Sequence, residues 1–338
     1  MDDQHPYRVT IPPMSANSQR PRWSVMIPTY NCAGYLRETL AGVLAQDPGE
    51  ALMQIEVVDD CSTRDDPEAV VAQLGCGRVG FYRQPHNVGH VANFNTCLQR
   101  ARGELVHLLH GDDGVRDGFY RTMQRAFDEN PRIGNAFCRH IIMDEYGHWQ
   151  TISPLERLES GPLSNWLEEI AVGQRLQAPS MVVRRDVYER LGGFDRRLHF
   201  YGEDWEMWVR IAAFYPVWYE TMPLAVYRIH KVSLSGRSQR TGENMQDLRR
   251  AIEINENCLP RTRAVDLSRQ ARENCALAAI RRASRMEMDD LLVALAQVRE
   301  AFRCGHSLRV IGAAISLFVL SAWRAIRLAA SLLREKTQ

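Results

Sequence analysis

In this sequence, the end of the first predicted strand lacks the glycine-rich turn by which many nucleotide-binding proteins are recognised. No G-x-G-x-x-G turn follows this strand, and no G-x-x-x-x-G-K-[ST] loop occurs among the 338 residues of the chain. Such loops let backbone amides approach a diphosphate closely, so dinucleotide-dependent dehydrogenases and P-loop NTPases require them. We therefore set both classes aside.

Lysine is nearly absent as well. Only Lys231 and Lys336 occur, although basic residues total 42 against 41 acidic residues. This near-neutral total lacks the strongly basic balance of a nucleic-acid-binding protein. The preference for arginine is typical of a GC-rich bacterial genome, and it makes any single arginine weak evidence for a site.

Cysteine motifs for metal binding are also missing. The sequence has no C-x-x-C pair and no zinc spacing; its eight cysteines are Cys32, Cys61, Cys76, Cys97, Cys138, Cys258, Cys275 and Cys304. We expect free thiols in a reducing cytoplasm. Residues 1–21 contain no apolar signal-peptide region, and we expect them to form a loose extension.

Apolar runs alternate with helical patterns in the first third of the chain. Strands are predicted over Trp23–Tyr30, Ile55–Ser62 and Val79–Arg83 and again from Leu105, with helices between them. Strands that alternate with helices form right-handed βαβ units, which predicts an α/β fold with a mostly parallel, Rossmann-like sheet. We assign residues 22–240 to this domain.

Two of these runs end in paired carboxylates. Asp59 and Asp60 close the second strand, and Asp112 and Asp113 follow the fourth. Open α/β sheets bind ligands at the carboxyl ends of their strands, so both pairs are candidate site residues. A hard divalent cation would keep two adjacent carboxylates ionised. The alternatives are a surface turn at Asp112–Asp113 and a helix cap at Asp59–Asp60.

Seven motifs follow one another between Ser24 and about His230. They read SVMIPTYN, IEVVDDCSTRDD, NVGHVANFN, ARGELVHLLHGDD, SMVVRRDVYERLGGFD, GEDWEMWVRI and YRIH. Together they resemble the family 2 glycosyltransferases of GT-A fold, and specifically their inverting, non-processive members. The Q-x-x-R-W pattern of processive members occurs only as QRPRW at Gln19–Trp23, where the first predicted strand begins, and not after the GEDW motif. The resemblance implies a nucleotide-sugar donor and a divalent metal cofactor, Mg²⁺ or Mn²⁺.

The resemblance also implies which residues contact the donor. The nucleotide-binding positions would be Pro28, Thr29, Tyr30, Asn31, Asp59, Asp60, Asn87, Asp112 and Arg228. Asp60, with Asp59 as the alternative, would accept a hydrogen bond from the base, because a carboxylate can accept from an imide N–H. Arg228 would contact the diphosphate, since a guanidinium matches phosphate geometry.

The implied metal ligands are Asp113, Asp112 and His230. The family's commonest metal motif is D-x-D-D, and here His110 stands in place of the first acid. We interpret His110 as a nearby polar contact rather than a ligand. At His230 the alternative is a structural role.

Gly202-Glu203-Asp204-Trp205 begins a predicted helix. The resemblance makes Asp204 the general base, supported by Glu203, because an attacking acceptor hydroxyl must lose its proton. The alternative is that acids simply favour a helix N-terminus. Trp205 is a candidate for stacking on the acceptor sugar, and a core position is the other interpretation.

Residues 241–338 change character and become almost entirely helical. Residues 261–338 contain 14 Lys/Arg and 7 Asp/Glu. Within them the uncharged run Val310–Trp323 is too short to span a bilayer comfortably. We expect a helix over 307–333 that lies on a membrane surface, the alternative being a helix that packs against the catalytic domain or a twin subunit in a homo-oligomer.

These patterns lead to one functional hypothesis. The chain would be a metal-dependent, inverting glycosyltransferase that acts on a saccharide or polyprenyl-linked acceptor in bacterial cell-surface polysaccharide synthesis. We expect it in the cytoplasm, peripheral on the inner membrane, with no nucleic-acid partner. The alternatives are a non-catalytic nucleotide-sugar-binding scaffold and a nucleotidyltransferase.

Overall fold

The chain forms two compact units. The computed structural model describes residues 6–15, 20–230, 233–284 and 291–319. The first of the two units, here called the sheet unit, comprises Met1–Ile170, Gln174–His199 and Glu203–Lys231. The second, the helical unit, comprises Ala171–Gly173, Phe200–Gly202 and Val232–Gln338. Because α8 (Leu234–Thr241) is grouped with the later helices, the helical unit begins before the predicted boundary at 241.

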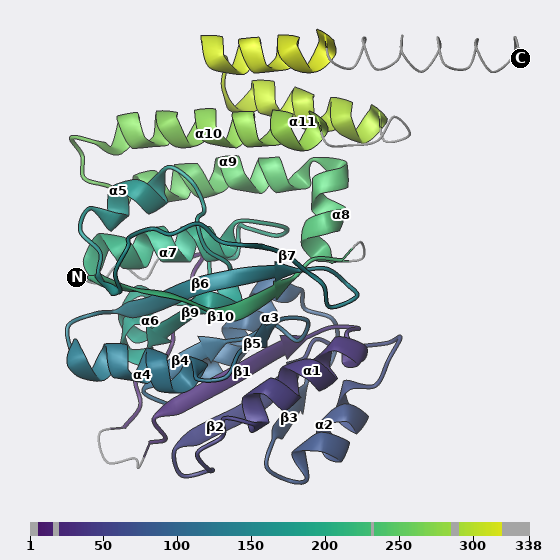
Figure 1. The fold of residues 1–338 in the computed structure, drawn as a ribbon, viewed down its shortest axis with the longest axis vertical. Coiled ribbons are helices and arrows are strands. Elements are labelled where there is room, and N and C mark those ends of the chain that lie inside the picture. Colours follow the sequence, from purple (N-terminus) through teal and green to yellow (C-terminus); the bar gives the residue numbers. More distant parts are fainter. Residues whose placement is uncertain (1–5, 16–19, 231–232, 285–290, 320–338) are drawn as a thin grey trace, which may run out of the picture. The chain divides into compact units, whose positions relative to one another are not determined.

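One half of the sheet is parallel. The strand order is β3-β2-β1-β4, with β1 at Trp23–Thr29, β2 at Met53–Asp59, β3 at Gly80–Arg83 and β4 at Leu105–Leu108. All three pairings are parallel. Every residue of β1 and β2 is buried, which explains why these strands read as continuous apolar runs. The predicted order of strands and helices is confirmed (Figure 1).

The other half is mixed. β9 (Met181–Arg184) lies antiparallel between β4 and β6 (Asn135–Met143), and β10 (Val217–Arg228) runs parallel to β6. The short strands β5 (Gly114–Val115) and β8 (Gly161–Pro162) pair antiparallel with β10. β7 (Trp149–Ile152) pairs with β6. The sheet is therefore mostly parallel, with antiparallel strands in its second half.

Seven α-helices and one 3₁₀-helix accompany these strands in the described part of the sheet unit. They are α1 (Ala33–Leu44), α2 (Pro67–Gly75), α3 (His90–Arg100), α4 (Phe119–Glu129), α5 (Trp166–Ala171), α6 (Arg185–Leu191), α7 (Glu203–Phe214) and η1 (Ala178–Ser180). Apolar side chains of α1, α2 and α4 pack with those of β1 and β2 in the main core. The connections place α3 and α7 so that their first residues contribute to the site described below.

The N-terminal residues 6–15 are held by the segment after α6. Val9 and Ile11 are buried. The Gly193 amide donates to the Val9 carbonyl, and the Arg196 amide donates to the Tyr7 carbonyl. We call residues 7–12 the N-terminal strap. It lies beside a turn that precedes α7, the helix that carries Asp204.

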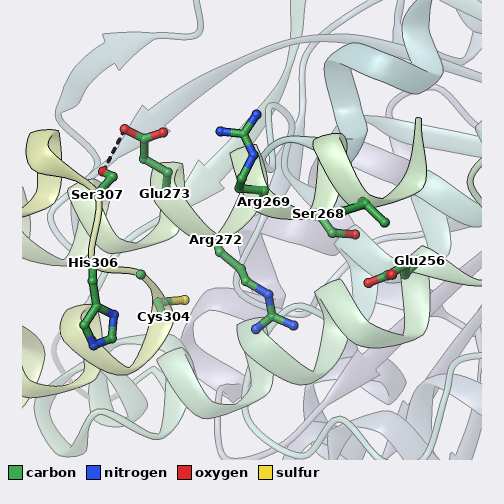
Figure 2. Close-up of a pocket in the computed structure, with 10 residues that line it drawn as sticks. Glu256, Ser268, Arg269, Arg272, Glu273, Cys304, His306 and Ser307 are labelled. Carbon is green, nitrogen blue, oxygen red and sulfur yellow. Dashed lines mark hydrogen bonds between the residues drawn. The ribbon is translucent and has the colours of Figure 1, made fainter. Parts of the chain in front are cut away.

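The helical unit contains α8, α9 (Glu243–Glu256), α10 (Ala264–Ser284), α11 (Leu291–Cys304) and the helical residues 308–319. Figure 1 shows α9, α10 and α11 in a stack. Among the described residues no helix is both long and apolar enough to cross a membrane. A cavity of about 460 Å³ lies in this unit, lined by residues of α9, α10 and the turn after α11 (Figure 2).

Candidate active site

The ends of β1 and β4 approach each other closely. The Gly111 amide donates to the Pro28 carbonyl, and the Asp60 amide donates to the Thr29 carbonyl. A side chain at Gly111 would place its Cβ 2.9 Å from Thr29 Oγ1 and 3.0 Å from Cys32 Sγ. Only glycine therefore fits between the two strand ends. This close approach brings the first turn and the second acidic pair together.

The first acidic pair, Asp59 and Asp60, is bound by donors of the protein. Asp59 is buried, accepts from the amide and hydroxyl of Ser62, and lies 2.8 Å from Arg83 Nε. Asp60 accepts from the amides of Val88 and Gly89 at 2.7 and 3.0 Å. Burial raises the pKa of Asp60 above its usual value, although those two amides act against the shift. Both carboxylates thus fix the loops that follow β2 and β3.

The turn after β1 is tied to the same loops. Asn31 has a left-handed backbone with φ of 51°, and its side-chain oxygen accepts from the amides of Thr63 and Arg64. Asn87 donates from its side chain to the Asp60 carbonyl. Tyr30 is 45% exposed. Of the predicted nucleotide-binding turn, Tyr30 presents the most accessible side chain.

The second acidic pair, Asp112 and Asp113, has a different environment. Asp113 Oδ1 accepts from the Arg228 amide at 2.9 Å, whereas Asp113 Oδ2 is buried without a hydrogen-bond partner among the described residues. Burial and the neighbouring Asp112 charge raise the pKa of Asp113 well above its usual range. Burial acts on Asp112 in the same direction, but the His230 hydrogen bond of 2.9 Å, the charges of His110 and His230 and a backbone amide together lower the pKa of Asp112.

These residues fit a divalent cation. One ligand atom from each of His110, Asp112 and Asp113 lies within 4.8 Å of the others. Asp113 Oδ2 is buried and accepts no hydrogen bond from the described residues, with His110 Nδ1 3.6 Å away, and a cation would remove the cost of its charge. His230, which we predicted as a ligand, contacts Asp112 through Nε2, and its Nδ1 has no hydrogen-bond partner among the described residues.

Arg228 holds the second pair in place. Its side chain is buried, with Nε 3.0 Å from the Asp112 carbonyl and Nη2 2.5 Å from Glu38. Its guanidinium also lies 4.7 Å from the centre of the Tyr35 ring. Thr39 of α1 donates its hydroxyl to the Asp113 carbonyl at 2.6 Å. Arg228 is thus largely used by protein contacts, which makes it a positioning residue as well as a candidate phosphate contact.

A third acidic pair begins α7. Gln174 Nε2 donates to Asp204 Oδ2 at 2.7 Å. Burial and the adjacent Glu203 charge raise the pKa of Asp204 to about 7, although the Trp205 amide and Gln174 oppose the shift. Burial also disfavours the charge of Glu203, but His90, at 3.4 Å, lowers the pKa of Glu203 overall. Asp204 therefore has the pKa that suits a general base near neutral pH.

His110 links the second and third pairs. Its ring stacks on Phe94 with centroids 4.8 Å apart, and Phe94 also contacts the edge of the His90 ring. Burial lowers the pKa of His110, while Asp112 and Glu203 both act to raise it. His110 Nδ1 also lies 3.6 Å from Asp113 Oδ2, and His90 lies 3.4 Å from Glu203. These contacts join the end of β4 and the start of α7 in one polar site.

Comparison with known sequences identifies the family. Residues 24–192 match the family model described as Glycosyl transferase family 2. The chain belongs to this family. It is also 30% identical over 251 residues to an uncharacterized protein of Mycobacterium tuberculosis, covering 71% of this chain and 77% of that protein.

Two further relatives carry informative names. An uncharacterized glycosyltransferase of Rickettsia typhi is 24% identical, with 64% of this chain and 67% of that protein covered. The O-antigen biosynthesis protein RfbC of Myxococcus xanthus is 26% identical, with 61% of this chain but only 17% of that protein covered.

Solved structures share the GT-A fold of this glycosyltransferase. S. aureus TarS in complex with UDP-GlcNAc superimposes with a TM-score of 0.64 at 16% identity, covering 86% of this chain and 82% of that one. The mannosyltransferase PcManGT of Pyrobaculum calidifontis, in complex with GDP-Man and Mn²⁺, gives a TM-score of 0.57 at 20% identity. The match covers 97% of this chain and 87% of that one. At these identities the likeness establishes the fold.

Trp205 has a core position in this glycosyltransferase. It is fully buried, and its indole N–H donates to the Ile170 carbonyl at 2.7 Å. The ring as placed cannot stack on an acceptor sugar, so the core interpretation fits it. Gln174, His90 and Thr39 were not anticipated from the sequence. Gln174 lies 30 residues from Asp204, and no local pattern signals that pairing.

Proposed function

We propose that this family 2 glycosyltransferase moves a sugar from a nucleotide-sugar donor to an acceptor hydroxyl, inverts the anomeric carbon, and acts without processivity. The observation that carries the proposal is the union of two acidic pairs at one site. Asp112 and Asp113 lie at the end of β4, and Glu203 and Asp204 begin α7. His110 contacts Asp113 and stacks on Phe94, which also contacts His90, the partner of Glu203. One pair suits a diphosphate with its cation, and the other suits proton removal.

Asp204 is the proposed base. An acceptor hydroxyl that attacks the anomeric carbon loses its proton to a carboxylate within hydrogen-bond reach. With a pKa of about 7, Asp204 is both substantially ionised at neutral pH and basic enough to take that proton. Gln174 fixes the Oδ2 atom, and Glu203, held by His90, keeps a second negative charge beside it. A single displacement from this side inverts the sugar carbon.

Asp113, Asp112 and His110 are the residues that would hold a divalent metal, with His230 in contact with Asp112. Such a cation, when bound, neutralises the departing nucleoside diphosphate. The chain's own contribution is to keep these side chains in place. Arg228 binds the Asp112 carbonyl and the Asp113 carboxylate, and Thr39 binds the Asp113 carbonyl.

The nucleotide would lie along the ends of β1 and β2. Pro28 through Asn31 form the turn there, and the exposed Tyr30 ring is available to the base. Asp60 accepts from two amides but retains lone pairs for a base N–H. Asp59, whose carboxylate is engaged by Ser62 and Arg83, serves better to fix the loop than to contact the base.

The acceptor class is proposed from similarity. RfbC is described as an O-antigen biosynthesis protein, and its matching segment supports a role for this chain in cell-surface polysaccharide assembly. A saccharide or a polyprenyl-linked saccharide would then be the acceptor, and the enzyme would work at the cytoplasmic face of the inner membrane.

A ligand screen followed by an assay tests the proposal. UDP, GDP, CDP and dTDP are added to the full-length protein with Mn²⁺, with Mg²⁺ or with EDTA, and the melting temperature is measured. A ligand at 100 times its dissociation constant stabilises by about 2.7 kcal/mol. The sugar nucleotides of the stabilising base are then assayed for release of nucleoside diphosphate, and NMR of the product reports the anomer.

The same experiment separates the alternatives. A non-catalytic scaffold would be stabilised by a nucleotide but would release no diphosphate from any sugar nucleotide. A nucleotidyltransferase would produce pyrophosphate rather than a nucleoside diphosphate. Retention of the donor anomer would refute the single displacement.

A further inference from the structure

The helical residues 308–319 have one apolar face that is covered and one that is exposed. Val310 and Ala314 are buried at 0% and 3% exposure. On the other side a row of large apolar side chains is accessible: Leu308 (87%), Ile311 (39%), Ile315 (58%), Phe318 (54%) and Val319 (62%). We call these five residues the exposed stripe.

The exposed stripe is a continuous surface. Positions 308, 311, 315 and 318 follow the spacing of one face of an α-helix, and 319 adjoins them. Single exposed apolar residues are common on soluble proteins, but five on one face of one helix are a candidate interaction site. The buried residues Val310 and Ala314 account for one side of the helix and leave the stripe without a function in the fold.

Charge indicates what covers the stripe. From His306 to the end of the chain the sequence contains five basic residues and one acid, Glu335. Arg309, within the helix, has a side chain that is 74% exposed. A second copy of this chain would bring two segments of the same net charge together, whereas an anionic lipid surface would attract them.

We infer that the exposed stripe lies in the interfacial region of an anionic lipid membrane, with the helix along the surface. Burial of the stripe among lipid acyl chains removes apolar area from water, and the exposed Arg309 remains at the headgroups. This inference does not depend on which residue is the base, and it would place the enzyme beside the lipid-linked acceptor proposed above.

Vesicle co-sedimentation of the full-length protein tests this inference. Vesicles of phosphatidylcholine with 30% phosphatidylglycerol are compared with pure phosphatidylcholine at low and high salt. We expect binding to the anionic vesicles at low salt and weaker binding at high salt. The double variant I315E/F318E should lower the partition coefficient at least tenfold, because two charges replace apolar contacts with lipid.

A matched control is available in the sheet unit. L52E/F214E replaces two residues of similar exposure, 52% and 63%, and adds the same charge. This control should bind vesicles as the unaltered protein does. Melting temperature and nucleotide-induced stabilisation should be unchanged in both variants, so a failure of the catalytic proposal and a failure of this one give different results.

Two outcomes would overturn the inference. One is that the unaltered protein does not bind anionic vesicles at low salt, or that I315E/F318E binds equally well. The other is that light scattering shows a dimer which I315E/F318E converts to a monomer, with no effect on vesicle binding. The stripe would then be an interface between two copies.

Discussion

Two Asp-Asp pairs stand at the ends of parallel strands, and their environments are opposite. The carboxylates of Asp59 and Asp60 accept hydrogen bonds from four neighbouring residues. Asp113 has a buried oxygen without a hydrogen-bond partner among the described residues, and its pKa is raised. The same dipeptide at the same kind of position is therefore held by hydrogen bonds from the protein in one case and is the proposed metal site in the other.

The segment that follows each pair explains the difference. After Asp60 the chain turns back, and the Ser62 amide and hydroxyl face Asp59. After Asp113 the chain enters β5, whose residues pair with β10, and among the described residues the carboxylate accepts one amide hydrogen bond, from Arg228. An acidic pair at a strand end indicates a ligand site when the next residues leave an oxygen unused.

The largest expected effect comes from the third pair, Glu203–Asp204. Asp204→Asn should lower kcat by roughly 10²–10⁴-fold, because the amide cannot take the acceptor proton. Donor binding and melting temperature should remain close to those of the unaltered enzyme. Asp117→Asn, at an exposed acid outside the site, is the matched control. A kcat for Asp204→Asn within a few-fold of normal would assign the base elsewhere, with Glu203 next in line.

The Asp112–Asp113 pair should determine how the enzyme responds to metal. At 100 times its dissociation constant, a nucleoside diphosphate with Mn²⁺ should stabilise the enzyme by about 2.7 kcal/mol. Asp113→Asn should reduce this stabilisation to the value measured in EDTA, without lowering the stability of the free protein, because it removes a buried carboxyl whose charge is disfavoured. Full activity of the unaltered enzyme in EDTA would contradict the metal assignment.

Substitution in the Asp59–Asp60 pair should lower stability and leave the response to metal unchanged. Asp59→Asn weakens buried hydrogen bonds to Ser62 and Arg83, and we expect a loss of about 2 kcal/mol in the free energy of unfolding. The stabilisation by nucleotide and Mn²⁺, relative to EDTA, should persist in this variant. If Asp59→Asn instead abolished the metal response while leaving denaturant unfolding unchanged, the contrast between the two pairs would be lost.

The smallest effect concerns pH. If Asp204 is the base, as proposed, it must be ionised to act, so kcat/KM should rise with pH up to about 7 and then level off. The Gln174 hydrogen bond favours the ionised form. Gln174→Leu should therefore raise the pH at which kcat/KM levels off by about one unit or less, and one unit corresponds to about 1.4 kcal/mol. An unchanged pH dependence of kcat/KM would mean that Gln174 does not act on the base.

Stability gives an independent measure of the same group. The pKa of Asp204 in the folded enzyme lies above its ordinary value of 3.8. Its contribution to stability is therefore fully present below that value and is lost as the pH rises through about 7. Asp204→Asn should remove this loss, so the stability of the variant relative to the unaltered enzyme should increase between pH 4 and pH 8.

Much of the frame was predictable from local patterns. The apolar runs that became β1 and β2, and the acids that follow them, appear directly in the sequence because buried parallel strands are continuous and their ends are polar. The role of each acid was less accessible. In the sequence, Asp59 and Asp113 both belong to an acidic dipeptide after an apolar run. Only the three-dimensional positions of Arg83 and the Arg228 amide distinguish them.

The partners that tune the site could not be predicted for a similar reason. Arg228 and Glu38 are 190 residues apart, and His230 and Asp112 are 118 apart. No periodic pattern links positions so distant, and a glutamine such as Gln174 has no strong preference for any element. The role of Trp205 was ambiguous for a different reason: an aromatic residue in an amphipathic helix suits both a core and a sugar-binding surface.

The N-terminal strap has a consequence for the order in which the protein is made. Arg8 pairs with Glu206 of α7, 198 residues later in the chain. At a synthesis rate of about 5–20 residues per second, the strap would wait on the order of 10–40 s for that partner. The strap can thus make this contact only after α7 has been synthesised. A fragment limited to residues 24–192 would lack both ends of this junction.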